Sequence, residues 1–369
     1  MHTDPSFLQG LWFILIGILW TGFFVLEGFD FGVGMLVRVL GRDRIEKRMI
    51  IHTIGPVWDG NEVWLLTAGG ATFAAFPNWY ASMFSGFYLA LFLVLAALIV
   101  RGVSFEFWGK VDAPRWRNGW EWALAISSGA AALLFGVAWA DIVHGVPMNA
   151  QQVVTANLSD LLHPYALLAG LTTLSLFLVH GANYLSGRTS GGIQQRAEVL
   201  ARRAAPVAAV LMIGFLVWTA ADQSWSAAVV AVALPAAAAV VTIPVLLRRS
   251  DGWAFVAGAV SIVLLVAVWF TSLWPNALPS TTNHAYDLTL SAAASHRYTL
   301  IVMSVVAAIF VPIVLGYGAW SYWVFRARLN RADYEAPLTA TAVLERRTDG
   351  RPGARPSAAR PEPGPAASA

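Results

Sequence analysis

The feature that most constrains this chain is a succession of nine long apolar segments, which fills most of its 369 residues. A run of about 20 apolar residues spans the hydrocarbon core of a bilayer as a helix. The segments run approximately over residues 7–39, 50–76, 80–101, 120–143, 161–183, 204–222, 225–247, 253–274 and 299–325. Only 12% of the residues are charged, whereas soluble domains carry about 25%. The sequence therefore predicts an all-α polytopic membrane protein with nine transmembrane helices.

The basic residues predict how the chain is oriented in the membrane. All of the 24 Lys and Arg residues except Arg297 lie at the ends of the odd-numbered segments or after them, with Arg38 and Arg101 assigned to the loops that follow segments 7–39 and 80–101. Cytoplasmic loops carry an excess of Lys and Arg. The N-terminus is therefore expected outside and the C-terminus in the cytoplasm. A distribution set by topology also argues against a nucleic-acid partner, although the pI is near 9.3.

Composition separates two regions and excludes several kinds of site. Residues 1–325 are expected to form one transmembrane domain. Residues 326–369 are rich in Arg, Pro and Ala without apolar periodicity, which predicts a disordered basic cytoplasmic tail. The chain has no cysteine, so disulfides, iron–sulfur clusters, thiolate zinc sites and c-type haem attachment are excluded. The first apolar run is too long for a cleavable signal peptide and lacks a basic leading region.

Two pairs of carboxylates stand inside the predicted spans. Asp59 and Glu62 belong to the run Trp58-Asp59-Gly60-Asn61-Glu62-Val63-Trp64-Leu65, and Glu27 and Asp30 lie in the first segment. Residues three apart share one face of a helix. A charge inside the membrane costs at least about 3 kcal/mol, and such residues normally face a protein interior or a water-filled path. All four carboxylates are therefore functional candidates.

The predicted topology places these acids in the cytoplasmic half of the membrane. Asp59 lies about ten residues into its segment, or roughly 15 Å at the rise of a helix. Asp30 lies at a comparable depth from the same side. We interpret the four acids as a proton route that opens to the cytoplasm. The alternative is a structural role, in which the acids pair with buried arginines or cap broken helices. No Arg or Lys is expected within a span, so such a pairing would need a partner protein.

The histidines are expected to lie at interfaces rather than to ligate haem. His52 and His180 are placed near the cytoplasmic ends of spans, and the pairs His144/His163 and His284/His296 in or beside outer loops. A haem held across a bundle needs two histidines at matching depth on facing spans. The chain is therefore expected to bind neither haem nor another metal.

The motifs resemble subunit II of the cytochrome bd-type quinol oxidases. The specific ones are the run from Trp58 to Leu65 and Gly28-Phe29-Asp30-Phe31-Gly32-Val33-Gly34. Further matches are Phe84-Ser85-Gly86-Phe87-Tyr88, Arg115-Trp116-Arg117-Asn118, Gly145-Val146-Pro147 and Pro279-Ser280-Thr281-Thr282. They are spread from residue 10 to about residue 325, so the resemblance covers nearly all of the chain except the tail.

The resemblance implies an architecture and a set of partners. It implies two four-helix bundles with a peripheral ninth helix, in the bacterial cell membrane. A homologous subunit I would hold the haems b and d and the quinol-oxidising loop. The complex would oxidise quinol and reduce O2 to water with cytoplasmic protons. The resemblance also allows a structural quinone in this chain and small accessory single-helix subunits beside it.

The resemblance assigns roles to individual residues as well. The position of Asp59 lines a proton path in the family, and that of Trp64 lies near the mouth of an oxygen path from the lipid. Trp58, Asn61 and Glu106 are expected to support these paths. Glu62 stands where Gln is familiar and Glu106 where Asp is familiar, so a proton step at Glu62 does not follow from the resemblance.

A proton-coupled secondary transporter is the alternative function, with Asp59 and Asp30 as the coupling sites. Transporters of this kind usually contain inverted repeats and broken helices at the membrane midplane. The sequence shows no clear repeat, and its acids lie off the midplane. A transporter should be active when expressed alone, whereas an oxidase subunit needs its partner.

Overall fold

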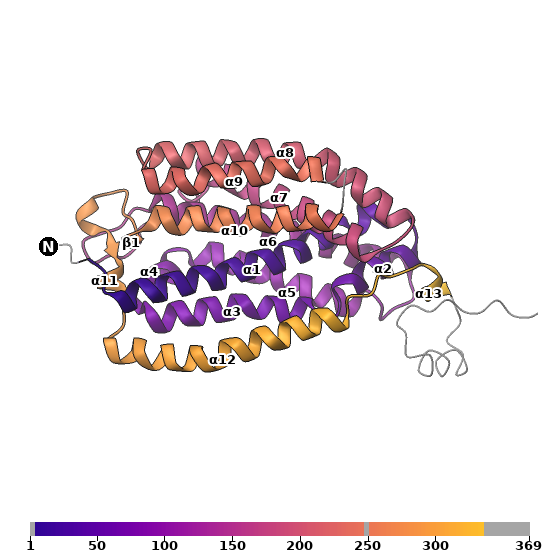
Figure 1. Cartoon of the computed structure of the whole chain (residues 1–369), viewed down its shortest axis with the longest axis horizontal. Coiled ribbons are helices and arrows are strands. Elements are labelled where there is room, and N and C mark those ends of the chain that lie inside the picture. The colour runs from indigo at the N-terminus through magenta and orange to yellow at the C-terminus, as the bar shows by residue number, and fades with distance from the viewer. Residues whose placement is uncertain (1–3, 247–250, 336–369) are drawn as a thin grey trace, which may run out of the picture.

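The computed structural model describes residues 4–246 and 251–335, and it is a bundle of long, roughly aligned helices (Figure 1). Eight helices of the described residues are long and apolar enough to cross a membrane. They are α1 (Phe7–Leu40), α5 (Tyr88–Phe107), α6 (Pro114–His144), α7 (Pro164–Arg188), α8 (Gly192–Asp222), α9 (Ala227–Leu246), α10 (Asp251–Leu273) and α12 (Arg297–Val324). An all-α membrane architecture is thus confirmed.

The second predicted segment is divided into two helices. Helix α2 (Arg44–Ile54) ends before Gly55-Pro56, and α3 (Trp58–Ala75) begins after it. Pro56 has no backbone N–H to continue the helical hydrogen bonds, and Val57 after it departs from helical geometry, so a single continuous helix is interrupted there. Helix α3 runs beside α1 in Figure 1, but it is not one of the eight apolar helices. The count of nine spans therefore stays a prediction.

The third segment also differs from its expected bounds. Helix α4 (Pro77–Gly86) is separated from α5 at Phe87, and α5 continues to Phe107 rather than ending at Arg101. The last six residues of α5 are Gly102-Val103-Ser104-Phe105-Glu106-Phe107, a sequence apolar enough to continue the helix. This shift of the helix end moves Arg101 from a loop into a helix.

Helix α1 is central, because it packs against α3, α6, α7 and α10. Its contact with α7 is a backbone contact: a Cβ added at Gly181 would lie 2.5 Å from the Cα of Gly32. Small residues let membrane helices approach in this way. Helix α12, in contrast to α1, is peripheral. It lies along one edge of the bundle in Figure 1, and Leu300 is its only buried residue.

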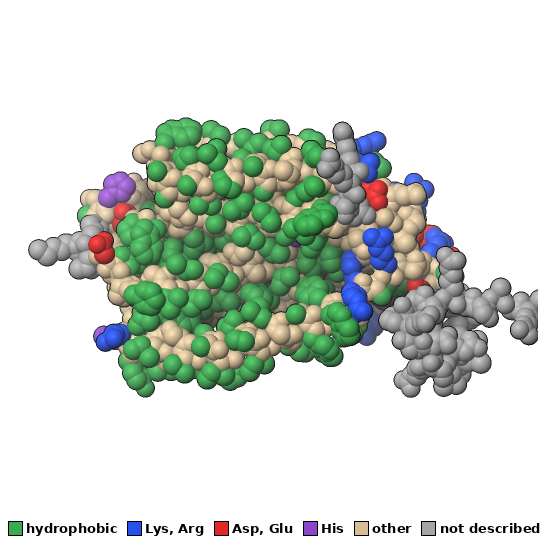
Figure 2. All heavy atoms as spheres, in the orientation of Figure 1, with side chains coloured by type: hydrophobic (Ala, Val, Ile, Leu, Met, Phe, Trp, Pro, Cys, Tyr) green, Lys and Arg blue, Asp and Glu red, His purple; other side chains and the backbone are tan. Residues whose placement is uncertain are grey.

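Charges gather at one end of the bundle. Figure 2 shows mainly hydrophobic side chains over its middle, with Lys and Arg towards the end that carries α2 and α13 (Ala332–Glu335). The positive-inside rule places that end in the cytoplasm, and this orientation stays a prediction.

The loop between α10 and α12, at the other end of the bundle, is folded and contacts other parts of the same chain. It contains the antiparallel strands β1 (Asn276–Leu278) and β2 (Leu288–Thr289), the 3-10 turn η1 (His284–Tyr286) and the short helix α11 (Leu290–Ala293). The backbone of Val146 joins it through hydrogen bonds with Pro279 and Thr281. Gly145 has φ 92°, where only glycine fits easily, and a Cβ there would lie 2.8 Å from the Pro279 carbonyl oxygen.

The beginning of the expected tail rests on the end of the bundle that carries α2. Arg331 lies 2.6 Å from the Asp43 carboxylate, and the Tyr334 hydroxyl lies 3.0 Å from Nδ1 of His52. The rest of the expected tail, residues 336–369, falls outside the described residues.

Candidate functional site

The acids of the first two predicted spans meet a buried arginine. Nη2 of Arg101 lies 3.0 Å from Oε2 of Glu27, and both side chains are fully buried. Nη1 of Arg101 lies 3.7 Å from Oε2 of Glu62, whose side chain is 24% exposed. The expectation that no Arg lies within a span is therefore wrong. The missed signal was the apolar sequence after Arg101, which extends α5 by one and a half turns.

Aromatic rings surround the guanidinium of Arg101. It lies 4.8 Å from the ring centroid of Phe31, 5.3 Å from that of Phe105 and 5.9 Å from that of Trp58. Rings at these distances attract a cation and displace water from it. The ion pair between Arg101 and Glu27 is thus held in an apolar shell that three helices supply.

A hydrogen-bonded line runs from the peripheral helix to the second acid of α1. The hydroxyl of Tyr322 on α12 donates to Oδ1 of Asn61 at 2.7 Å. Nδ2 of Asn61 on α3 donates to Oδ2 of Asp30 at 2.7 Å. Asn61, expected only as a supporting residue, therefore connects two helices, and Tyr322 was not singled out from the sequence at all. An aromatic hydroxyl in the last turns of an otherwise apolar helix was the available signal.

Two buried carboxylates keep free acceptor capacity. Oδ1 of Asp30 and Oε1 of Glu27 have no hydrogen-bond donor among the described residues. Buried oxygens without a partner are costly when they are charged. They therefore offer positions where a proton or a water molecule would be stabilised.

The remaining residues predicted for the site lie on the exposed side of the group formed by Glu27, Asp30, Asn61 and Arg101, or near it. Asp59, in the first turn of α3, and Glu106, on α5, are exposed. Glu62 lies between the exposed face and the buried acids, since it reaches Arg101 but keeps part of its surface free. Trp64 packs on Gly22 of α1 and is partly buried. The structure thus separates Asp59 and Glu106 from the buried group of Glu27, Asp30, Asn61 and Arg101.

An apolar cavity of about 530 Å³ lies beside the same helices. Leu65, Gly69 and Phe73 of α3 line it together with Trp20 of α1 and Phe92 of α5. Gly69 and Gly70 have no side chain that could fill the space. The cavity can therefore hold a small apolar molecule or an acyl chain.

The histidines occupy two different environments. His180 is fully buried in α7, with Nε2 3.2 Å from the carbonyl oxygen of Val25, so the expectation of an interfacial position fails for it. Helix α7 continues to Arg188, which places His180 two turns inside its end. Where α6 ends and α7 begins, Nε2 of His163 lies 2.9 Å from Oδ1 of Asp141, and the ring centroid of His163 lies 5.0 Å from that of His144. Burial and the neighbouring His144 lower the pKa of His163.

No group of three or more His, Cys, Asp or Glu side chains within residues 4–246 and 251–335 has the placement to hold a metal ion. The histidine contacts above are instead made to a backbone carbonyl, to carboxylates and to other rings. The carboxyl groups of Glu27 and Asp30 are of the chemical type that can take up and release a proton.

Comparison with known proteins gives one consistent result. The family model for cytochrome bd terminal oxidase subunit II matches residues 8–325. Cytochrome bd ubiquinol oxidase subunit 2 of Bacillus subtilis (strain 168) is 41% identical over 337 residues, which is 90% of this chain and 99% of that protein. Cytochrome bd-I ubiquinol oxidase subunit 2 of Escherichia coli (strain K12) is 37% identical over 370 residues, or 90% and 98% of the two chains.

A solved structure shares the fold. A chain of the bd oxidase from Geobacillus thermodenitrificans superposes with a TM-score of 0.71, covering 87% of this chain and 99% of that one. Its sequence identity is 19%, so this likeness concerns the fold alone.

Proposed function

Because the chain belongs to the cytochrome bd terminal oxidase subunit II family, we propose that it is the haem-free second subunit of a bacterial plasma-membrane quinol oxidase that reduces O2 to water. Haems b and d would be held by a homologous subunit I. The match of the family model over residues 8–325 carries this proposal. The transporter alternative loses its basis, since the matched relatives are oxidase subunits.

The partner would cover the exposed face of α3. This face carries Asp59, Gly60, Leu66 and Gly70, all exposed in the chain alone. A carboxylate and small residues in a membrane helix normally face protein rather than lipid. Subunit I would therefore pack against α3 and cover the open side of the apolar cavity, which Leu66 and Gly70 also line. Any small accessory subunit or lipid would occupy other surfaces.

The proton path would begin at this covered face. Asp59 would accept protons near the cytoplasmic side. Glu62 would carry them towards the buried acids, because it lies 3.7 Å from the buried Arg101 and keeps part of its side chain exposed. Glu27 and Asp30 have unpartnered oxygens that can accept a proton. Arg101 would hold Glu27 in place, Asn61 would orient Asp30, and Trp58 and Glu106 would line the approach.

Gas access would follow the apolar side of the same helix. Trp64 lies next in the chain to Leu65, which lines the apolar cavity of about 530 Å³. O2 is apolar and is concentrated in hydrocarbon rather than in water. The isoprenoid chain of a structural quinone is the second occupant that we propose for this cavity.

Purification of the tagged full-length chain from its native membrane tests the proposal. A second membrane subunit should co-purify, with the absorption bands of haems b and d and with quinol-dependent O2 consumption. The chain expressed alone should show no Soret band. A stoichiometric Soret band in the lone chain that is lost in His180→Ala, or a native preparation without any haem protein, would contradict it.

A further inference from the structure

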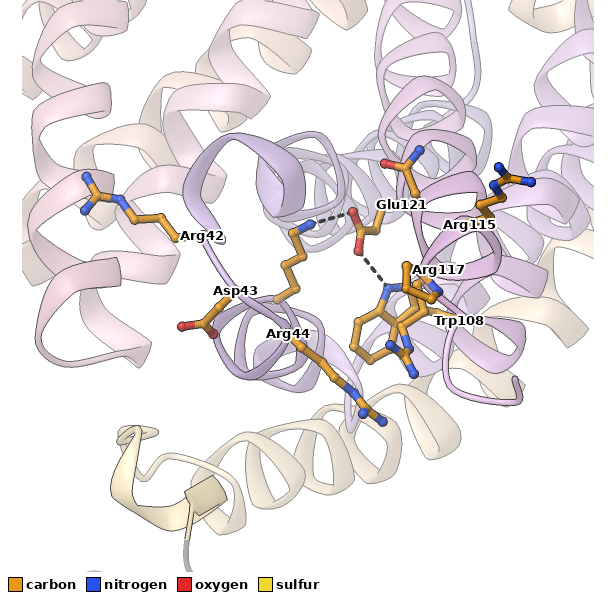
Figure 3. A pocket seen from close by; sticks show the side chains of 10 residues that line it. Arg42, Asp43, Arg44, Trp108, Arg115, Arg117 and Glu121 are labelled. Carbon is orange, nitrogen blue, oxygen red and sulfur yellow. Dashed lines mark hydrogen bonds and ion pairs between the residues drawn. The ribbon is translucent and has the colours of Figure 1, made fainter. Parts of the chain in front are cut away.

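A second cavity, of about 510 Å³, lies at the end of the bundle that the positive-inside rule places in the cytoplasm. The turn between α1 and α2, the end of α5 and the start of α6 enclose it (Figure 3). Five basic side chains line it: Arg42, Arg44, Lys47, Arg115 and Arg117. Its volume falls within the range of about 300–1,000 Å³ that ligand pockets occupy. None of the acids assigned to the proton path lines it.

The two acids of this basic cavity already have partners. Glu121 accepts from Nζ of Lys47 at 2.8 Å and from Nε1 of Trp108 at 3.2 Å, as Figure 3 shows, and Arg38 lies 3.1 Å away. Asp43 is slightly desolvated, which favours its neutral form. Hydrogen bonds from the backbone of Glu46 and from Arg331 nevertheless lower its pKa. Neither carboxylate is therefore free to neutralise the remaining arginines.

The positive charges of the basic cavity are not all neutralised by carboxylates. Arg44 and Arg117 share a single carboxylate, that of Asp112, whose side chain is 78% exposed. Arg42 and Arg115 make no side-chain hydrogen bond or ion pair with any residue in the described parts of the chain. The cavity has a polar floor, formed by Glu121 and Trp108, and basic side chains around it. The guanidinium groups of Arg42 and Arg115 lie on opposite sides and are turned away from this floor in Figure 3, free of any carboxylate.

The start of α6 adds a second attraction for an anion. Pro114, which lines the basic cavity, is the first residue of this 31-residue helix, and Ala113 before it provides no side-chain cap. Pro114 has no N–H and the N–H of Arg117 donates to the carbonyl of Ala113, so the N–H groups of Arg115 and Trp116 are the ones that lack a side-chain cap. The helix dipole favours negative charge there. Phosphate groups commonly bind where such a terminus meets basic side chains.

We propose that the basic cavity binds a phosphate group, and that the headgroup of an anionic phospholipid of the cytoplasmic leaflet supplies it. Basic pockets between helices on this side of a membrane suit anionic headgroups. The acyl chains could continue along the apolar surface, where Phe107 and Trp122 are exposed next to the cavity. The site does not depend on the proposed oxidase activity.

Equilibrium binding to the full-length chain, purified with the subunits that accompany it, tests this site. Dioleoyl phosphatidylglycerol in neutral detergent is the probe, with dioleoyl phosphatidylcholine and inorganic phosphate as parallel arms. The variant is Arg42→Gln/Arg115→Gln, which removes two unpaired charges. Arg203→Gln/Arg328→Gln is the matched control, because it removes two exposed arginines of the same end away from the cavity.

Phosphatidylglycerol should bind the wild type more tightly than phosphatidylcholine does. The Arg42→Gln/Arg115→Gln variant should weaken binding by about fivefold for each charge, or about 25-fold for the pair. The control should bind as the wild type does, and unfolding curves should coincide for all three proteins. If inorganic phosphate alone shows this sensitivity, the phosphate site stands and its ligand is the free anion. Equal losses in both variants, or no loss in either, would overturn the proposal.

Discussion

Removal of Arg101 should destabilise the protein strongly. In Arg101→Met the apolar shell of Phe31, Phe105 and Trp58 is largely filled, but Glu27 loses the guanidinium 3.0 Å away and stays fully buried. Breaking a buried ion pair from one side costs about 3–5 kcal/mol. The contact with Glu62 adds at most about 1 kcal/mol, because it is 3.7 Å long and partly exposed. The free energy of unfolding should therefore fall by about 3–5 kcal/mol.

The double variant separates the ion pair from packing. Glu27→Gln alone leaves Arg101 without its main counter-charge and should cost a similar amount. The combination Arg101→Met/Glu27→Gln removes both charges and should recover much of the loss, since apolar replacement of a whole buried pair is often neutral. The double variant should then lose less than either single variant, so the cycle should give a coupling energy of more than about 3 kcal/mol.

Unfolding in mixed micelles with increasing sodium dodecyl sulfate, followed by circular dichroism, measures these free energies. A cycle on Arg202 and Glu198 is the control, because that pair is 3.7 Å apart and half exposed. Its coupling should stay below about 1 kcal/mol. A coupling between Arg101 and Glu27 that is no larger than this control would refute the buried ion pair.

Two further substitutions test the packing around the same site. Gly32→Ala would place a methyl group against the backbone of Phe177 and Gly181, which cannot give way. The free energy of unfolding should therefore fall by about 1–3 kcal/mol in the same assay. Gly214→Ala, where nothing lies within 4 Å of the added methyl group, is the matched control and should be neutral. Tyr322→Phe would leave the carbonyl oxygen of Asn61 without its donor and should cost about 1–2 kcal/mol; a variant as stable as the wild type would show that α12 is not tied to α3 through this bond.

The sequence predicts those features of the fold that follow from the need for apolar spanning helices in a bilayer. A bilayer requires about 20 apolar residues for each spanning helix, so most segments appear at nearly their expected positions. The break at Pro56 and the extension of α5 to Phe107 were missed, because hydropathy reports burial in lipid rather than local backbone geometry. These errors of a few residues matter, since they decide whether Arg101 lies in a loop or inside the bundle.

The acids of the candidate site were predictable from the sequence, whereas its arginine, its tyrosine and the contacts between its members were not. An acid in an apolar run is visible in the sequence, so Glu27, Asp30 and Glu62 were found. That Arg101 pairs with Glu27, and that Tyr322 reaches Asn61, depends on how α1, α3, α5 and α12 are placed around each other. Spacing along one helix contains no information on that placement.

The rate of quinol-dependent O2 consumption by Asp59→Asn tests the central claim, that this chain conducts protons for an oxidase, most directly. The substitution keeps size and hydrogen bonding but removes the titratable group at the entrance of the proposed path. With haem content and assembly intact, the rate of Asp59→Asn should be about 100-fold or more below that of the wild type. Asp59→Glu should keep part of the wild-type rate. Asp160→Asn, in the loop between α6 and α7, should have the wild-type rate. A complex with Asp59→Asn that assembles normally and keeps the wild-type rate from about pH 6 to about pH 9 would contradict the proton path.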